Sequence, residues 1–419
     1  MSAFLVIIAL ALLFLKLVVA YSLDILNLRN VRKHAGSIPE GLEAVMSKER
    51  YQKSIRYTHS QTHFGYWERA YDGAILVLLL STSSLATIYE SISAVVGFGS
   101  WGQALGLFLI GLLLSIPSIP LDWWRQFRLE EAFGFNKSSV TLWVVDKLKG
   151  LFLGFLIGLP LLWLLIKAFD WLGTYWWIWA FVGLFIVQLV MMVVYPIWIM
   201  PWFNQFEDLP EGDLRDRLQA LADRTGFRAK TIQVMDGSKR SGHSNAFFTG
   251  FGKFRRIVLY DTLVEQLEPK QLEAVLAHEI GHYRCGHVPK MLAVSALGSF
   301  LMFGVLGFLS NQPGFVQAFG FSGTSGIVPV LLLFSLLSGL VTFWLTPLGS
   351  IFSRRHEYQA DAFAFIAQDS AEPLVGALHQ LCEKNLSNLT PHPFYSGFYY
   401  SHPTLLERQQ ALMSLKVSN

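Results

Sequence analysis

The stretch YWWIWAFVGLFIVQLVMMVVYPIW, residues 175–198, runs for 24 residues without one Asp, Glu, Lys or Arg. About 20 apolar residues in a helix cross the hydrocarbon core of a bilayer, which is about 30 Å thick. Hydrophobic residues make up 53% of the chain and charged residues only 15%, which is far from a soluble composition. Six more apolar stretches lie at about 3–20, 73–95, 101–119, 149–168, 291–310 and 327–349. The sequence therefore predicts an α-helical membrane protein with seven transmembrane helices.

The distribution of Lys and Arg predicts the orientation of these helices. Basic residues are frequent in the loops between spans one and two and between spans three and four, whereas the loops at about 96–100, 169–174 and 311–326 have none. The positive-inside rule then places the N-terminus outside and the C-terminus in the cytoplasm, so the polar stretches 199–290 and 350–419 share the cytoplasmic side. The net charge is only +3 and no basic stripe runs among aromatic residues, so nucleic acid is not an expected partner.

The polar stretch 199–290 has short elements of its own. Leucines recur at helical spacing and predict an amphipathic helix over 211–226. A small sheet is predicted from β-rich runs at 231–235, 244–250 and 256–260. Glu268 and Pro269 are typical of a helix start, so a second helix is expected to follow from there.

That second helix carries HEIGH, residues 278–282, which matches the HExxH motif. Histidines four residues apart project from the same face of a helix, so His278 and His282 can reach one metal ion, with Glu279 beside them to handle a water molecule. The pattern predicts a catalytic zinc site that hydrolyses peptide bonds. The alternative is a pair of ordinary surface histidines.

Catalytic zinc normally takes three protein ligands, so a third must come from elsewhere in the chain. The metzincin pattern fails, because Cys285 and Val288 occupy the positions where it requires Gly and His. Glu357 is the better candidate, with Asp361 one helical turn later to orient a histidine. The alternative for Glu357 is a surface carboxylate paired with a neighbouring arginine, Arg354 or Arg355.

With these motifs assembled, the sequence resembles the integral-membrane CAAX prenyl endopeptidases, a gluzincin family of zinc metalloproteases. The layout is similar over nearly the whole chain: seven spans, HExxH between spans five and six, and the ExxxD element just after span seven. The stretches similar to that family are FRLEEAFGFNK (127–137), SGHSNAFFTG (241–250), RRHEYQADAF (354–363) and SHPTLLER (401–408).

The resemblance implies roles that spacing cannot assign. Asn245 and Ala246 would lie on an edge strand that pairs with the substrate backbone. His402 would help to stabilise the oxyanion, and Arg408 would help to hold Glu357 or a substrate carbonyl. The resemblance also implies one Zn2+ per chain and a peptide or prenylated-protein C-terminus as substrate. The implied fold is seven transmembrane helices around a large chamber, with a small cytoplasmic α+β gluzincin-type domain.

The expected organisation has four segments. Residues 1–198 would form spans one to five, 199–290 the protease segment with the HExxH helix, 291–349 spans six and seven, and 350–419 a cytoplasmic C-terminal segment. The expected location is a bacterial inner membrane or the endoplasmic reticulum membrane. Two rival functions remain open: a general quality-control metalloprotease for membrane proteins, and a non-catalytic scaffold or channel with a vestigial metal site.

Overall fold

A computed structural model describes residues 2–227, 231–249, 255–321 and 326–415. Six helical runs in it are long and apolar enough to cross a membrane, and a bent pair of helices makes a seventh if the pair is counted as one span. The predicted class, a helical membrane protein with seven spans and a small sheet, is confirmed. The six runs are Phe4–Lys33, Ser100–Phe133, Val140–Trp171, Gly173–Trp202, His287–Ser310 and Val328–Gln368.

The six runs are longer than the predicted spans, and several of them are made of more than one helix. The first helix, α1 (Ser2–Lys33), continues well past residue 20, because nothing in the sequence before Lys33 breaks a helix. The other membrane helices are α4 (Ser100–Ser115), α5 (Ile119–Trp124), α6 (Glu131–Phe133), α7 (Val140–Leu153), α8 (Leu159–Trp171), α9 (Trp176–Val194), α13 (His287–Ser310), α15 (Val328–Thr342) and α16 (Thr346–Gln368).

The second span is not the continuous helix that the sequence predicts over 73–95. It consists of α2 (Lys48–Ser81) and α3 (Ser84–Val96), which meet at an angle of 74°. Hydroxyl side chains lie at the break: the Ser81 and Thr82 hydroxyls donate to backbone carbonyls one turn back, and the Thr82 hydroxyl oxygen accepts from the Ser84 N–H. Such local hydrogen bonds compete with the helix and bend it.

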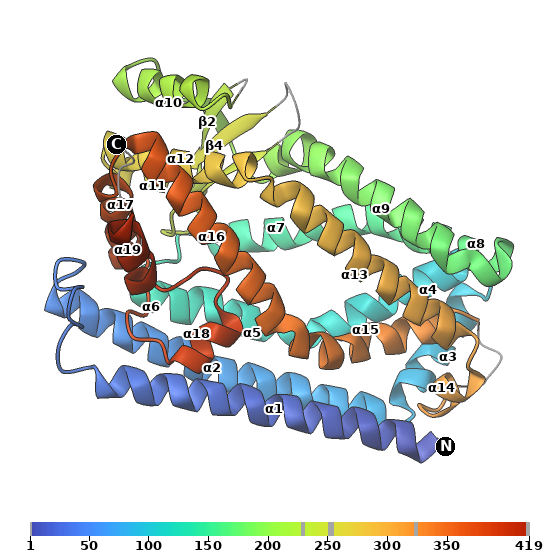
Figure 1. The fold of residues 1–419 in the computed structure, drawn as a ribbon. Helices are drawn as coiled ribbons and strands as arrows, with labels where there is room; N and C mark the ends of the chain where they lie inside the picture. Colours follow the sequence, from blue (N-terminus) through green and yellow to red (C-terminus); the bar gives the residue numbers. More distant parts are fainter. Residues whose placement is uncertain (1, 228–230, 250–254, 322–325, 416–419) are drawn as a thin grey trace.

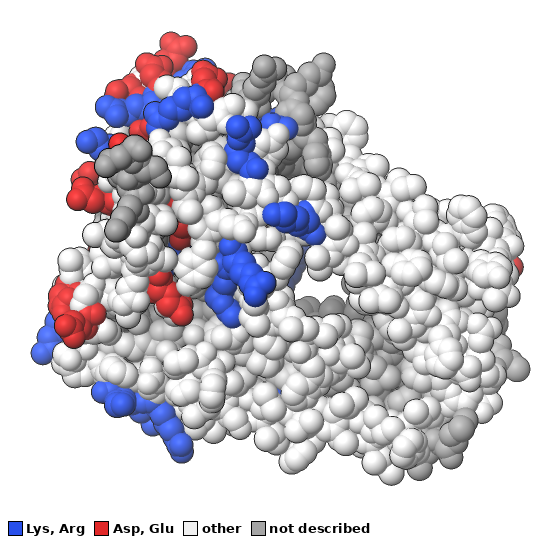
Figure 2. Space-filling model, in the orientation of Figure 1, with Lys and Arg blue, Asp and Glu red and all other residues white. Residues whose placement is uncertain are grey.

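The membrane-spanning runs are only partly buried. In the most apolar window of each run, between 6% and 39% of the residues are buried, which is low for a solid bundle of seven helices. Figure 2 shows an opening in the surface between α13 and α16, and it shows the charged side chains gathered at one end of the molecule.

The charged end holds a small α+β unit. Its sheet has the order β1-β2-β4-β3, with β2 parallel to β4 and the two outer pairs antiparallel. The predicted strands at 231–235 and 256–260 are confirmed; of the run 244–250, β3 covers Ala246–Thr249 and Gly250 lies outside the described residues. The strands are β1 (Phe206–Asp208), β2 (Thr231–Met235), β3 (Ala246–Thr249) and β4 (Arg256–Tyr260).

Helices cover this sheet and continue into the membrane. The predicted amphipathic helix is α10 (Asp213–Arg224), which buries Leu218 and Leu221 in a core shared with the sheet and α12. Figure 1 shows this unit and the C-terminal helices at one end of the molecule, with the N-terminus at the opposite end. The remaining helices are α11 (Asp261–Gln266), α12 (Pro269–Arg284), α14 (Pro313–Gln317), α17 (Glu372–Lys384), α18 (Pro393–Tyr399) and α19 (Leu405–Ser414).

Candidate metal centre

The HExxH motif lies on α12, which begins where the sequence predicts. Glu268 and Gln271 form a capping box at its start, so the orphan N–H groups of the first turn are satisfied. His278 is buried and His282 half-buried on the same face. Two ordinary surface histidines are therefore excluded.

The facing helix is α16, which continues the seventh span without a break into the small α+β unit. Its buried face includes Glu357 and Asp361, one turn apart. The two helices pack closely because position 281 is glycine: a Cβ there would lie 2.9 Å from the Cα of Ala360. A larger residue at position 281 would push the histidines of α12 away from Glu357.

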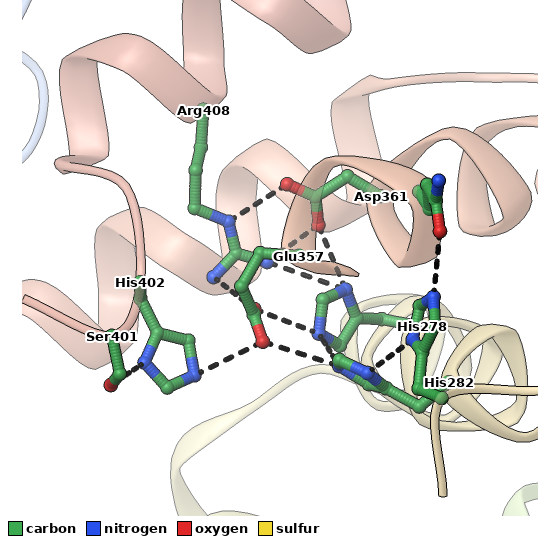
Figure 3. A network of polar contacts seen from close by, with 9 residues as sticks. His278, His282, Glu357, Asp361, Ser401, His402 and Arg408 are labelled. Carbon is green, nitrogen blue, oxygen red and sulfur yellow. Dashed lines mark hydrogen bonds and ion pairs between the residues drawn. The ribbon is translucent and has the colours of Figure 1, made fainter. Parts of the chain in front are cut away.

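The ligand atoms of His278, His282 and Glu357 lie within 4.8 Å of one another. The Nε2 atoms of the two histidines are 3.1 Å apart, and each is 3.3 Å from an oxygen of Glu357 (Figure 3). Glu357 is buried, and its Oε2 has no hydrogen-bond partner among the described residues.

The tautomers follow from the hydrogen-bond partners on the far side of each ring. Asp361 Oδ1 lies 2.8 Å from His278 Nδ1, and an ionised carboxylate can only accept, so the proton is on Nδ1. Gln359 Oε1 accepts from His287 Nε2 at 2.8 Å, which leaves His287 Nδ1 to accept from His282 Nδ1 at 2.9 Å. Both Nε2 atoms then present lone pairs to the carboxylate of Glu357. Hydrogen-bond acceptors that converge in a buried site require a cation between them. These three side chains therefore fit a metal ion.

Arg408 fixes the outer side of this cluster. Its guanidinium donates to both oxygens of Asp361, at 2.8 and 2.5 Å, and its Nη1 lies 3.9 Å from Glu357 Oε2. Figure 3 shows it reaching from α19 toward both carboxylates. The surface alternative for Glu357 is wrong, because Glu357 is buried and Arg354 instead donates to backbone carbonyls at the end of α18.

Two further polar side chains border the ligand set. His402 approaches Glu357 from the side opposite the α12 histidines, with its Nε2 3.5 Å from Glu357 Oε1 (Figure 3). Its side chain is 61% exposed, so it faces a space that a substrate can enter. Glu279 is half-buried next to His278, and burial raises the pKa of its carboxyl group.

Asn245 and Ala246 lie at the start of β3, which is an outer strand of the sheet. Tyr260 N–H donates to the carbonyl of Asn245 at 3.0 Å, so Asn245 bonds inward to β4. Because the bonding direction alternates along an antiparallel pair, the backbone groups of Ala246 and Phe248 point to the free side. The Asn245 side chain accepts from the Ala246 N–H at 2.9 Å. The backbone of Phe248 thus faces the free edge of the sheet, and the sequence did not identify this residue.

Three residues lie behind the ligands. His287 is buried and joins His282 to Gln359, while its ring stacks on His356 at a centroid distance of 4.0 Å. His287 follows the HExxH motif by five residues, but the chain turns at Gly286, whose φ of 67° is left-handed. That turn was the available signal, because it brings His287 back toward His282.

Comparison with known proteins shows the family of this chain. A family model described as the CAAX prenyl protease N-terminal region with five membrane helices matches residues 27–205, and the model of peptidase family M48 matches residues 208–416. The chain is 39% identical to CAAX prenyl protease 1 of Saccharomyces cerevisiae over 402 residues, which cover 90% of this chain and 88% of the yeast protein. The chain belongs to peptidase family M48.

Other relatives extend the likeness over the whole fold. CAAX prenyl protease 1 homologues of Arabidopsis thaliana and Homo sapiens are 34% and 31% identical, covering 90% and 93% of this chain and 90% and 91% of theirs. The crystal structure of S. mikatae Ste24p superposes with a TM-score of 0.89 at 35% identity, covering 97% of this chain and 98% of that one. This M48 chain is a multi-pass membrane metalloprotease, so the non-catalytic scaffold is set aside.

Proposed function

We propose that this protein binds one Zn2+ through His278, His282 and Glu357 and cleaves peptide bonds near the C-terminus of prenylated proteins. The observation that carries the metal site is the convergence of three acceptor groups, of which His278 and Glu357 are buried, with the tautomers of the two histidines fixed from behind. Nitrogen and carboxylate ligands in this number suit zinc, and they leave one position open. The chemistry that zinc supplies when bound is polarisation of a carbonyl group and acidification of water.

The chain's own residues divide the remaining work. Glu279 is placed to accept the proton of the attacking water and to return it to the leaving amine. His402, exposed beside Glu357, is placed to donate to the oxyanion that develops on the substrate carbonyl. Asp361, held by Arg408, keeps the proton of His278 on Nδ1, as carboxylate partners of ligating histidines generally do.

The substrate peptide pairs with the free edge of β3. Asn245 and Ala246 begin this edge, and an extended peptide can add to it as a further strand. The substrate class follows from the relatives, whose names are those of CAAX prenyl proteases. The proposed reaction is removal of a C-terminal tripeptide from a prenylated protein. The edge strand would hold the peptide, and the membrane spans place the enzyme in the bilayer where a prenyl group also partitions.

Product mapping on a farnesylated peptide ending in a CAAX sequence tests this function. We expect cleavage after the prenylated cysteine, with release of an intact tripeptide, detected by mass spectrometry of the detergent-solubilised enzyme. The same enzyme should leave an unfolded membrane protein without prenyl groups intact. Cleavage of the unfolded protein at many sites, with the farnesylated peptide untouched, would instead favour the quality-control protease.

The proposed orientation has the N-terminus outside and the catalytic end in the cytoplasm. In a variant with Cys285 and Cys382 replaced, single cysteines are placed at exposed Ser37, Asp213 and Gln312. In sealed vesicles with the cytoplasmic face outward, we expect an impermeant thiol reagent to label the first two positions and to spare Gln312→Cys. The reverse pattern would place the catalytic end outside the cytoplasm. Ser322, in the same loop as Gln312, lies outside the described residues.

A further inference from the structure

Two motifs that the metal site does not use meet next to the edge strand. The segment after the third span, which contains Phe135 and Asn136, crosses the loop 240–243 that leads into β3. Gly242 N–H donates to the Phe135 carbonyl at 3.0 Å, and Asn136 forms a β-bridge with Ser241. Lys137 N–H donates to the carbonyl of Arg240 at 3.1 Å. A loop of the membrane region thus runs as a short antiparallel partner beside the entry to β3.

His243 is at the centre of this crossing. Its ring stacks face to face on Phe135, with centroids 4.1 Å apart and planes 16° from parallel. Its Nδ1 lies 2.9 Å from Asn385 Oδ1, beyond the end of α17, and its Nε2 is 3.8 Å from Glu130 Oε2. The carbonyl of His243 accepts from the Thr262 hydroxyl at 3.1 Å. The residue is therefore held from four directions, two positions before Asn245.

Glu130 is itself anchored in the membrane helices. Tyr57 on α2 donates its hydroxyl to both oxygens of Glu130 at 3.0 Å, and Tyr57 is buried. The Glu130 carboxylate raises the pKa of His243 above its ordinary value, despite burial, so the charged ring is favoured next to it. Cavities of about 500 and 550 Å3 lie on either side, and Tyr57 and His243 line both. Because the ring borders these cavities, it depends on the contacts above for its position.

We propose that His243 is a positioning residue that fastens the entry of the substrate-pairing strand β3 to the ends of the membrane helices through Glu130 and Tyr57. The inference rests on the proposed function, because it assigns His243 to substrate pairing by β3. Among the described residues, His243 makes no contact with the metal-binding side chains. Its effect reaches the substrate only through the direction in which β3 leaves the loop.

The consequence is a separation of binding from chemistry. If the entry to β3 is loosened, the free edge of the strand is presented in several directions, and a peptide must select one of them before it pairs. The ligand helices α12 and α16 are held by their own packing and stay in place. Loss of the His243 contacts should therefore raise KM and leave kcat nearly unchanged, which is the pattern for weakened uniform binding.

The test compares His243→Gln, His243→Ala and Glu130→Gln in the full-length protein. We expect KM for the farnesylated peptide to rise about tenfold in His243→Ala, with kcat within about twofold of wild type and metal content unchanged. His243→Gln places an amide nitrogen near the position of Nε2 and should recover part of the loss. The double variant Glu130→Gln/His243→Ala should have the same KM as His243→Ala alone, since each substitution removes the same contact between His243 and Glu130. The matched control is His59→Gln. His59 lies on α2, where its ring contacts that of His63, and the substitution should leave KM unchanged.

A second measurement does not depend on turnover. In hydrogen exchange followed by mass spectrometry, the peptide that covers β3 should exchange faster in His243→Ala, while the peptide that covers α12 should not change. Unchanged exchange in β3, or a fall in kcat with KM unaltered, would overturn the assignment of His243. A wild-type enzyme that fails to cleave the farnesylated peptide would refute the proposed function instead, and the exchange comparison would still decide the role of His243.

Discussion

Glu279→Gln is expected to keep its metal and to lose nearly all hydrolysis. The amide has almost the same shape as the carboxylate, and Glu279 is not among the three groups that converge on the metal position. The substitution removes the only function that we assign to this residue, which is to take and return a proton. General acid–base catalysis contributes about 10²- to 10⁴-fold, so kcat should fall by an amount of that order. Metal content is measured by elemental analysis and kcat on the farnesylated peptide.

Glu273→Gln is the matched control for this variant. Glu273 lies on the same helix, is buried, and accepts from Arg224 at 2.8 Å, far from any role in proton transfer. We expect its variant to lower thermal stability while the kcat of the folded protein stays near that of wild type. Wild-type turnover in Glu279→Gln would be incompatible with the proposed mechanism, and loss of metal in that variant would turn Glu279 into a ligand.

The residues of the metal centre could be predicted from the sequence because they occur in pairs that lie close together along the chain. His278 and His282, like Glu357 and Asp361, are spaced by one helical turn, so periodicity alone places each pair on one face. What the sequence does not contain is how the two helices meet. That depends on the close approach at Gly281, which is set by tertiary packing.

The parts that sequence analysis missed depend on contacts between distant segments or on departures from regular structure. His243 and Glu130 lie in different motifs, and only the folded chain shows that those motifs touch. The bend in the second span comes from hydroxyl groups that bond to the helix backbone, whereas hydropathy counts the same residues as part of one apolar stretch. The lengths of the helical runs were underestimated because α1 and α16 continue past the apolar stretches as regular helices.

Glu357→Ala should lose both metal and activity, which distinguishes a ligand from a proton carrier. Glu357 supplies the single carboxylate among the three converging groups, and it compensates the positive charge of the ion in a buried site. Because metal affinity depends on the number and charge of the ligands, removal of one of three should reduce the bound metal from stoichiometric to trace amounts after dialysis. His278→Ala and His282→Ala should behave in the same way, since each deletes another ligand.

Asp361→Asn provides the comparison that makes the Glu357 result interpretable. Asp361 touches His278 Nδ1 and Arg408 but contributes no ligand atom, so its variant should bind metal about 10- to 100-fold more weakly and remain partly active in excess zinc. Zinc titration monitored by activity and by elemental analysis separates the two cases, because excess zinc should restore Asp361→Asn and leave Glu357→Ala inactive. Stoichiometric zinc in Glu357→Ala would remove Glu357 from the ligand set. The third ligand would then have to be sought elsewhere, and His402, 3.5 Å from the carboxylate, would be the first residue to test.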